Sequence, residues 1–250
     1  MNRQKFLGVF AVAVVLSGCG GGGSDSQPQT PSALSFPLQD AYKALVAKGD
    51  VRTFSVSGSC GGSGNRTTAA AKGGATFEGA TALSAVTTTT MALSGCTPAS
   101  SAQTTTSYFD QSYTPLGEVV VGGSYGVYLT PPVIPVAVSV GSAGVIGTLT
   151  KYTSSTKTKP TCGTVNLSYA VEADASNTAI VNLIQKDFEL PNTGQPIFTT
   201  PSTTCASLGP VLTQTAQSRY RITASGSLTP MSTDIQYANG STAHLVLTYN

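Results

Sequence analysis

The stretch Gly163-Thr-Val-Asn-Leu-Ser-Tyr-Ala-Val-Glu172 alternates between apolar and small or polar side chains from end to end. The apolar side chains all fall on one face: Val165, Leu167, Tyr169 and Val171. A period of two is typical of a β-strand that buries one face and exposes the other. A turn is predicted at residues 174–177, followed by a returning strand over residues 179–188. This hairpin favours an antiparallel sheet.

The same period of two extends over most of the chain from residue 51 onward. Alternation begins at Phe54 and Val56, continues in a Thr-rich stretch at residues 83–93, and returns in residues 220–249. Thr and Val favour strands, whereas the 27 glycines and 14 prolines supply turns. We therefore predict a mainly β domain. Its antiparallel meandering sheet forms a curved sheet, a sandwich or a partial barrel, and one short amphipathic helix precedes it.

The helix is predicted over residues 37–48. Its apolar side chains share one face at helical spacing: Leu38, Ala41, Tyr42, Leu45 and Val46. Pro37 suits the first helical turn, and Gly49 suits the left-handed position after the last turn.

The last predicted hairpin, around Asn239-Gly240, has two possible registers. A two-residue loop would pair Ile235 with His244 and mix the two faces of the sheet. A three-residue loop that includes Ser241 pairs Ile235 with Leu245 and keeps the apolar face whole. Because a shift of one residue inverts every side chain, burial favours the longer loop, with a positive φ at Gly240.

The N-terminus carries a sorting signal. A basic segment with Arg3 and Lys5 precedes an apolar run at residues 6–16, which is too short to span a bilayer. The following quartet, Leu16-Ser17-Gly18-Cys19, resembles the lipobox of bacterial lipoproteins. The resemblance implies cleavage before Cys19, a diacylglycerol on its sulfur and acylation, as with palmitate, of the new amino terminus. Gly20 rather than Asp implies release to the outer membrane, and leaves open the periplasmic or surface face.

The chain accordingly divides into three parts. Residues 1–18 form the predicted signal peptide, residues 19–35 a Gly/Ser/Pro-rich tether, and residues 36–250 a β-rich domain. A division of this domain into two disulfide-bounded lobes, 36–115 and 116–250, is left open.

Composition excludes several classes of partner. The chain has 13 basic and 11 acidic residues, so removal of Arg3 and Lys5 leaves 11 of each and a formally neutral mature protein. A neutral chain with 10% charged residues has no basic face for nucleic acid. One histidine and no CxxC spacing argue against a metal site, and no cofactor is predicted.

Four cysteines remain once Cys19 carries lipid. An exported chain enters an oxidising compartment, where cysteines pair as disulfides. Three pairings are possible, and we favour Cys60–Cys96 with Cys162–Cys205 because each closes a local loop.

One motif suggests catalysis. Residues 122–126 (Gly-Gly-Ser-Tyr-Gly) match the G-x-S-x-G nucleophile elbow, and His244 follows Ser124 in the order found in α/β-hydrolases. An elbow must feed a helix, however, whereas the residues after Ser124 alternate like a strand and end in Pro131-Pro132. We therefore predict no catalytic residues, and keep a serine hydrolase using Ser124 and His244 as the alternative.

Two groups of side chains suggest binding. The polar face of the C-terminal strands carries one candidate patch: Arg219, Arg221, Asp234, Gln236 and His244. This patch could hold an anion, although a solvated sheet face is the favoured interpretation.

An aromatic platform for glycans or peptides is the second candidate: Tyr108, Phe109, Tyr113, Tyr125 and Tyr128. The predicted function is a non-catalytic binding or structural role in the envelope, with a hydrophobic, glycan or protein ligand on a curved sheet covered by the helix.

Overall fold

The computed structural model describes residues 33–157, 160–190, 209–238 and 244–250. At residues 160–162 it describes the backbone only. The first half of the chain holds these elements: β1 (Ser35–Phe36), α1 (Leu38–Lys48), β2 (Asp50–Gly58), β3 (Gly61–Thr68), β4 (Lys72–Phe77), β5 (Ala80–Ser94), β6 (Ser100–Phe109) and β7 (Pro115–Val120). The second half holds these: β8 (Tyr125–Tyr128), β9 (Val138–Ser139), β10 (Ala143–Tyr152), β11 (Pro160–Ala173), β12 (Thr178–Glu189), β13 (Val211–Thr223), β14 (Leu228–Tyr237) and β15 (His244–Tyr249).

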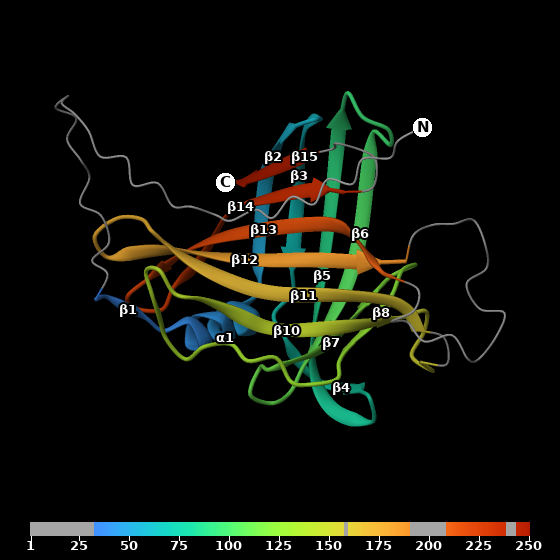
Figure 1. Ribbon diagram of the computed structural model, residues 1–250, viewed down its shortest axis with the longest axis horizontal. Helices are drawn as coiled ribbons and strands as arrows, with labels where there is room; N and C mark the ends of the chain where they lie inside the picture. Colours follow the sequence, from blue (N-terminus) through green and yellow to red (C-terminus); the bar gives the residue numbers. More distant parts are fainter. Residues whose placement is uncertain (1–32, 158–159, 191–208, 239–243) are drawn as a thin grey trace, which may run out of the picture.

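Twelve of the strands form a closed antiparallel barrel (Figure 1). Neighbours in the ring are mostly neighbours in sequence, as the predicted meander requires. Two long-range pairings complete it: β15 pairs with β2, and β3 pairs with β5. The prediction of a mainly β, antiparallel fold is confirmed. The three predicted forms of the sheet, a curved sheet, a sandwich or a partial barrel, were less specific than the closed barrel that the structure has. Closure pairs both edges that an open sheet would leave free.

Two short elements lie outside the ring. β4 pairs with the first half of β5, on the same edge that β3 occupies along the second half. β1 and β9 form a separate two-stranded ladder. The ring itself includes strands from both proposed lobes, 36–115 and 116–250.

Helix α1 closes one end of the barrel (Figure 1). It begins at Leu38 rather than Pro37, which precedes the first turn. Leu38 and Ala41 are buried with Val181 and Ile222 from the inner face of the barrel. After the last turn, Gly49 has a φ of 71°, and a Cβ there would lie 2.4 Å from the backbone oxygen of Thr68. The ψ of Gly49 is −178°, which is extended rather than left-handed helical. The prediction of a left-handed residue after the last turn is therefore correct for φ and wrong for ψ.

Strand register decides which side chains face inward. The predicted apolar face of β11 lies inside, where Val171 and Tyr169 belong to the core beneath α1. In the last hairpin Ile235 pairs with Leu245, which confirms the predicted register. Its loop, residues 239–243, lies outside the described residues. Both side chains pack in a second inward cluster with Phe54, Val56 and Leu247.

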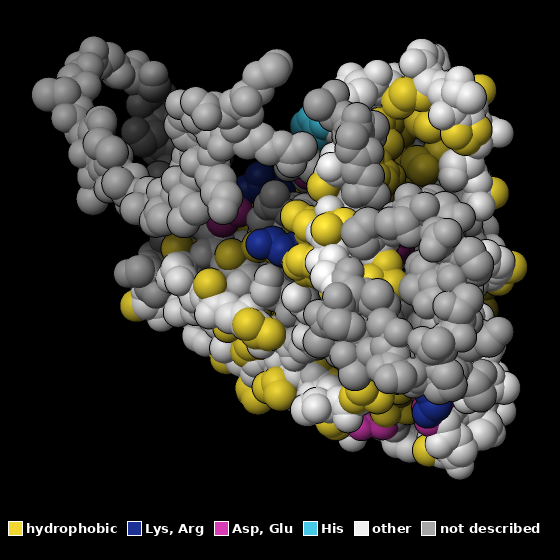
Figure 2. Space-filling model, turned by 45° about the vertical axis from the view of Figure 1, so that its right-hand side comes forward, with side chains coloured by type: hydrophobic (Ala, Val, Ile, Leu, Met, Phe, Trp, Pro, Cys, Tyr) yellow, Lys and Arg dark blue, Asp and Glu magenta, His cyan; other side chains and the backbone are white. Residues whose placement is uncertain are grey.

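The second cluster lies toward the opposite end of the barrel from α1. There the β2–β3 and β5–β6 connections are joined by a disulfide between Cys60 and Cys96, with Cα atoms 5.7 Å apart. Figure 2 shows a hollow lined with hydrophobic side chains in the upper part of the molecule. The other favoured pair, Cys162–Cys205, lies outside the residues whose side chains are described.

Candidate ligand-binding lumen

Twelve strands enclose more space than their own side chains can fill. A ring of about eight strands is just wide enough to be packed solid, and diameter grows roughly linearly with strand number. Part of the extra space beneath α1 stays open as two cavities. We call them the polar chamber, of about 260 Å³, and the apolar chamber, of about 80 Å³.

The polar chamber has hydroxyl-bearing and charged walls. Its polar side chains come from five strands: Asp50, Arg66, Thr68, Thr87, Ser107 and Tyr220. Cross-strand pairing brings Asp50 opposite Thr68 and Thr68 opposite Thr87, so these positions share the inner face. Tyr42, Leu45 and Val46 of α1 contribute to the same cavity. The chamber therefore combines a charged wall with a partly apolar one.

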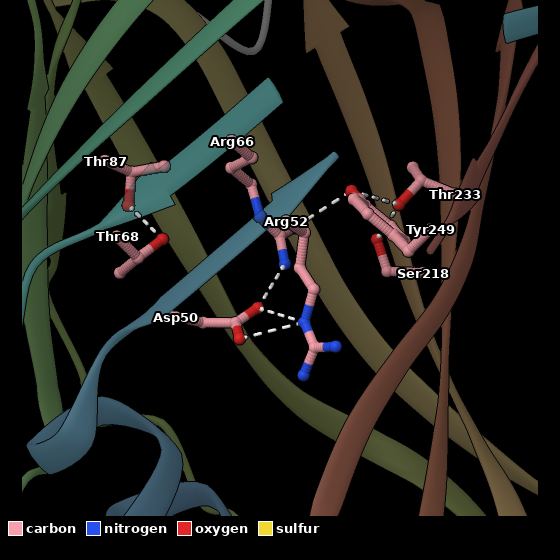
Figure 3. Close-up of polar contacts among 8 residues, drawn as sticks. All are labelled: Asp50, Arg52, Arg66, Thr68, Thr87, Ser218, Thr233 and Tyr249. Atoms are coloured by element: carbon pink, nitrogen blue, oxygen red, sulfur yellow. Dashed lines mark hydrogen bonds and ion pairs between the residues drawn. The ribbon is translucent and has the colours of Figure 1, made fainter. Parts of the chain in front are cut away.

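Arg66 belongs to a polar network that runs along the inner wall of the barrel (Figure 3). Its Nη1 donates a hydrogen bond of 3.0 Å to the Tyr249 hydroxyl, and its guanidinium carbon lies 4.7 Å from the centroid of that ring. The Tyr249 hydroxyl is 3.3 Å from Thr233 Oγ1, which in turn is 3.1 Å from Ser218 Oγ. The network thus links β3 to β13, β14 and β15.

Asp50 completes the charged wall. Its carboxylate accepts two hydrogen bonds from Arg52 Nε, at 2.9 and 3.2 Å, and lies 3.8 Å from Arg66 Nη2. A separate contact of 3.1 Å joins the hydroxyls of Thr68 and Thr87. Asp50 and Arg66 line the polar chamber, whereas Arg52 lines the groove beside it, and the three side chains together carry a net charge of +1.

The tyrosines of the chamber are uncharged donors. Burial raises the pKa of Tyr42, helped by the nearby Tyr128 and Tyr220. Burial also raises the pKa of Tyr220, although Arg66 opposes the shift. Both phenols therefore keep their protons at neutral pH and can donate hydrogen bonds to a ligand.

The apolar chamber adjoins the polar chamber and shares Tyr42, Leu45 and Tyr220 with it. Its other walls are aliphatic side chains of α1 and of the inner barrel face: Leu38, Ile146, Leu167, Val181, Leu183 and Leu228. Adjoining polar and apolar cavities suit a small amphipathic molecule.

An acidic cluster occupies another part of the inner face. Lys151, 8% exposed, donates to Asp187 at 2.6 and 2.7 Å and to Glu189 at 3.2 Å. Glu118 belongs to the same layer, because it pairs with Gly126, which pairs with Lys151. Burial raises the pKa of Glu118 and of Asp187, although Lys151 opposes both shifts. Burial therefore disfavours the charged form of both carboxyls.

The structure does not bring Ser124 and His244 together. Ser124 directly precedes β8, and His244 is the first residue of β15. These strands lie on opposite sides of the ring, with five strands between them in either direction. The helix that a nucleophile elbow requires is replaced by β8, and His244 Nε2 instead lies 2.9 Å from Asp234 Oδ1.

The candidate polar patch lies on the outer face and splits into two groups. Asp234 and Gln236 lie beside His244 on neighbouring strands. The two arginines instead turn toward β11: Arg219 pairs with Glu172, and Arg221 Nε donates to Asp174 at 2.7 Å. The hydrogen bond from Arg221 lowers the pKa of Asp174. Both guanidinium groups therefore already have carboxylate partners.

The candidate aromatic platform is also divided. Tyr108 and Tyr125 face outward and stack on Phe77 of β4. The centroid of the Phe77 ring lies 4.5 Å from that of Tyr108 and 5.3 Å from that of Tyr125. They line an outer groove of about 550 Å³ with Glu78 and Ser124. Although burial alone would raise the pKa of Glu78, hydrogen bonds from Lys157 and Tyr125 lower it.

The remaining aromatic candidates lie elsewhere. Phe109 and Tyr128 face the lumen, where Phe109 borders the polar chamber and Tyr128 lies opposite Leu149. Tyr113 occupies a turn between β6 and β7, with a φ of 65°.

Sequence reasoning missed Arg66 and Asp50. A signal was present, because Asp50 and Arg52 share the alternating face of Phe54 and Val56, where charge is unexpected. The two inward positions of β3 that precede Arg66, however, are Gly62 and Gly64. A Cβ at Gly64 would lie 2.4 Å from the Phe54 ring, so glycine there makes room for an aromatic side chain from β2.

Comparison with protein-family models, curated proteins and solved structures gives no match. Among the described residues, no helix is long and apolar enough to cross a membrane. The same residues contain no group of three His, Cys, Asp or Glu side chains placed to hold a metal ion. The case for function therefore rests on the lumen.

Proposed function

We propose that this protein is a lipid-anchored protein of the bacterial outer membrane that binds a small amphipathic ligand inside its barrel, without catalysis. The observation that carries the proposal is the polar chamber beneath α1, which adjoins an apolar chamber. Small-molecule sites are concave and mostly apolar, with a few polar groups that fix orientation. Arg66, Asp50 and the neighbouring hydroxyls supply those groups.

The anchor supports the location. Lipidation at Cys19 would tether the barrel through residues 19–35. The described chain enters the barrel at β1 and α1, because Phe36 and Leu38 share one buried cluster. The tether therefore joins the barrel at the end that α1 closes.

Ligand binding can be tested with two simple amphiphiles, octan-1-ol and octanoate. The full chain with Cys19→Ala avoids detergent, which would compete for the lumen. We expect saturable 1:1 binding of at least one probe in titration calorimetry. Ser107→Leu, which adds apolar volume inside the polar chamber, should weaken this binding at least tenfold.

The matched control is Thr106→Leu, which introduces the same side chain at the next residue of β6, where it points outward. It should leave binding unchanged. Thermal unfolding checks that both variants are folded. The proposal fails if neither probe binds the parent chain saturably, or if Thr106→Leu weakens binding as much as Ser107→Leu.

A further inference from the structure

We infer that the ligand of the lumen is a small amphipathic carboxylate, with its carboxylate on Arg66 and its apolar tail in the apolar chamber. This inference rests on the proposed function and adds the chemical class of the ligand. Three observations carry it: the hydrogen-bonding state of Arg66, the charge of the surrounding wall, and the shape of the space beside it.

Arg66 is placed as a receptor for an anion. A guanidinium has five N–H donors in a planar fork that matches a carboxylate. One donor goes to the Tyr249 hydroxyl, another hydrogen bond goes to the Tyr220 side chain, and Nη2 lies 3.8 Å from Asp50, beyond hydrogen-bond distance. The guanidinium carbon also lies over the Tyr249 ring, 4.7 Å from its centroid. Arg66 therefore has donor capacity beyond its contacts with Tyr249 and Tyr220, and it lines the polar chamber.

The charge of the wall also favours an anion. Asp50 cannot fully neutralise Arg66, because its carboxylate accepts both of its short hydrogen bonds from Arg52. A bound carboxylate would bring the net charge of Asp50, Arg52 and Arg66 from +1 to zero. Tyr220 and Tyr42 add neutral hydroxyl donors to the same cavity. A cationic ligand would instead add to the net positive charge of Asp50, Arg52 and Arg66.

Glu118 is a further carboxyl near the polar chamber that would oppose an anion in its charged form. Its cross-strand neighbour Ser107 lines the polar chamber. Burial raises the pKa of Glu118, which disfavours its charged form. Lys151 in the same layer is paired with two carboxylates, Asp187 at 2.6 Å and Glu189 at 3.2 Å.

The shape of the space sets the size of the ligand. A cavity of about 260 Å³ holds several waters or a molecule of about ten non-hydrogen atoms. The adjoining 80 Å³ is lined by Leu38, Val181 and Leu183 and accepts a few methylene groups. Each buried methylene should tighten binding about fourfold. Octanoate, with ten non-hydrogen atoms, has the required head and length.

The test compares three eight-carbon probes on the full Cys19→Ala chain: octanoate, octan-1-ol and octylammonium. We expect octanoate to bind at least tenfold more tightly than octan-1-ol, and octylammonium to bind most weakly. Arg66→Gln should remove the preference for octanoate while leaving octan-1-ol binding within about threefold. If Arg66→Gln fails to fold, Arg66→Lys keeps the charge, loses the fork and should give an intermediate preference.

The matched control is Arg221→Gln, the same change at an outward arginine of the candidate polar patch. It should leave octanoate binding unchanged. Equal binding of octanoate and octan-1-ol would overturn the inference while the proposed function stands. Loss of octanoate binding in Arg221→Gln but not in Arg66→Gln would move the anion site to the outer patch. Failure of all three probes would overturn both proposals.

Discussion

Arg66 contacts Tyr249 in two ways, through a hydrogen bond of 3.0 Å to the hydroxyl and through a guanidinium placed 4.7 Å from the ring centroid. The two residues belong to β3 and β15, which are separated in the ring by β2. This contact therefore spans the seam where the C-terminal strand meets the N-terminal strands. It connects the closure of the barrel to the wall of the polar chamber.

Tyr249→Phe should lower the free energy of unfolding by about 1–2 kcal/mol, because the hydroxyl interacts with charged Arg66 and with Thr233. The ring remains for Arg66 to stack on, so the barrel should still fold. Tyr237→Phe is the control, because that hydroxyl makes no hydrogen bond to the described residues. Denaturant unfolding measures both variants. Equal losses would mean that the Tyr249 hydroxyl contributes nothing specific.

Glu118→Gln should stabilise the protein at pH 7. Burial holds the pKa of Glu118 above its unfolded value of 4.5. The contribution of Glu118 to the free energy of unfolding is therefore lost as pH rises from the unfolded pKa through the folded pKa. Glutamine cannot ionise and avoids that loss. Below pH 4 the wild-type carboxyl is protonated in both states, and the advantage of the variant should disappear. A variant less stable at pH 7 would show that attraction to Lys151 outweighs burial.

Gly117→Ala should destabilise the protein by about 1–3 kcal/mol through overpacking. A Cβ at Gly117 would lie 2.2 Å from the backbone oxygen of Gly126 and 2.5 Å from Cζ of Phe77. Gly73→Ala provides the comparison, because the nearest atom to its Cβ would be 3.9 Å away. Thermal unfolding should separate the two variants clearly. Similar melting temperatures would argue against the packing of Phe77 on the outer face of β7.

Non-reducing peptide mapping of the exported protein should recover two crosslinks, Cys60–Cys96 and Cys162–Cys205. Replacing both Cys60 and Cys96 with serine should cost roughly 4 kcal/mol, because the bridge closes a loop of sequence separation 36 in the unfolded chain. Free thiols at these positions, or a Cys60–Cys162 crosslink, would contradict the pairing.

The wild-type protein should incorporate labelled palmitate and partition into the detergent phase, because Leu16-Ser17-Gly18-Cys19 resembles a lipobox. Cys19→Ala should abolish both properties and leave the barrel intact. Ser17→Ala, which keeps a small residue before the cysteine, is the control. A soluble, unlabelled wild-type protein would contradict the predicted anchor.

The sequence by itself determined the strands and the faces of their side chains. Alternation is a local property, so Val165 to Val171 identify the inner face of β11 without knowledge of its neighbours. The Ile235–Leu245 pairing was predictable for the same reason, because a shift of one residue would expose the apolar face. The outward position of His244 follows from the same alternation.

The tertiary structure alone decided that the sheet closes and that it encloses a chamber. Closure depends on pairs such as Leu247 with Val56, which are remote in sequence and leave no local signal. The inward position of Arg66 was hidden because Gly62 and Gly64 share its face and interrupt the apolar pattern. Side-chain alternation fixes a face relative to its own strand. The number of strands and their long-range pairing determine what that face encloses.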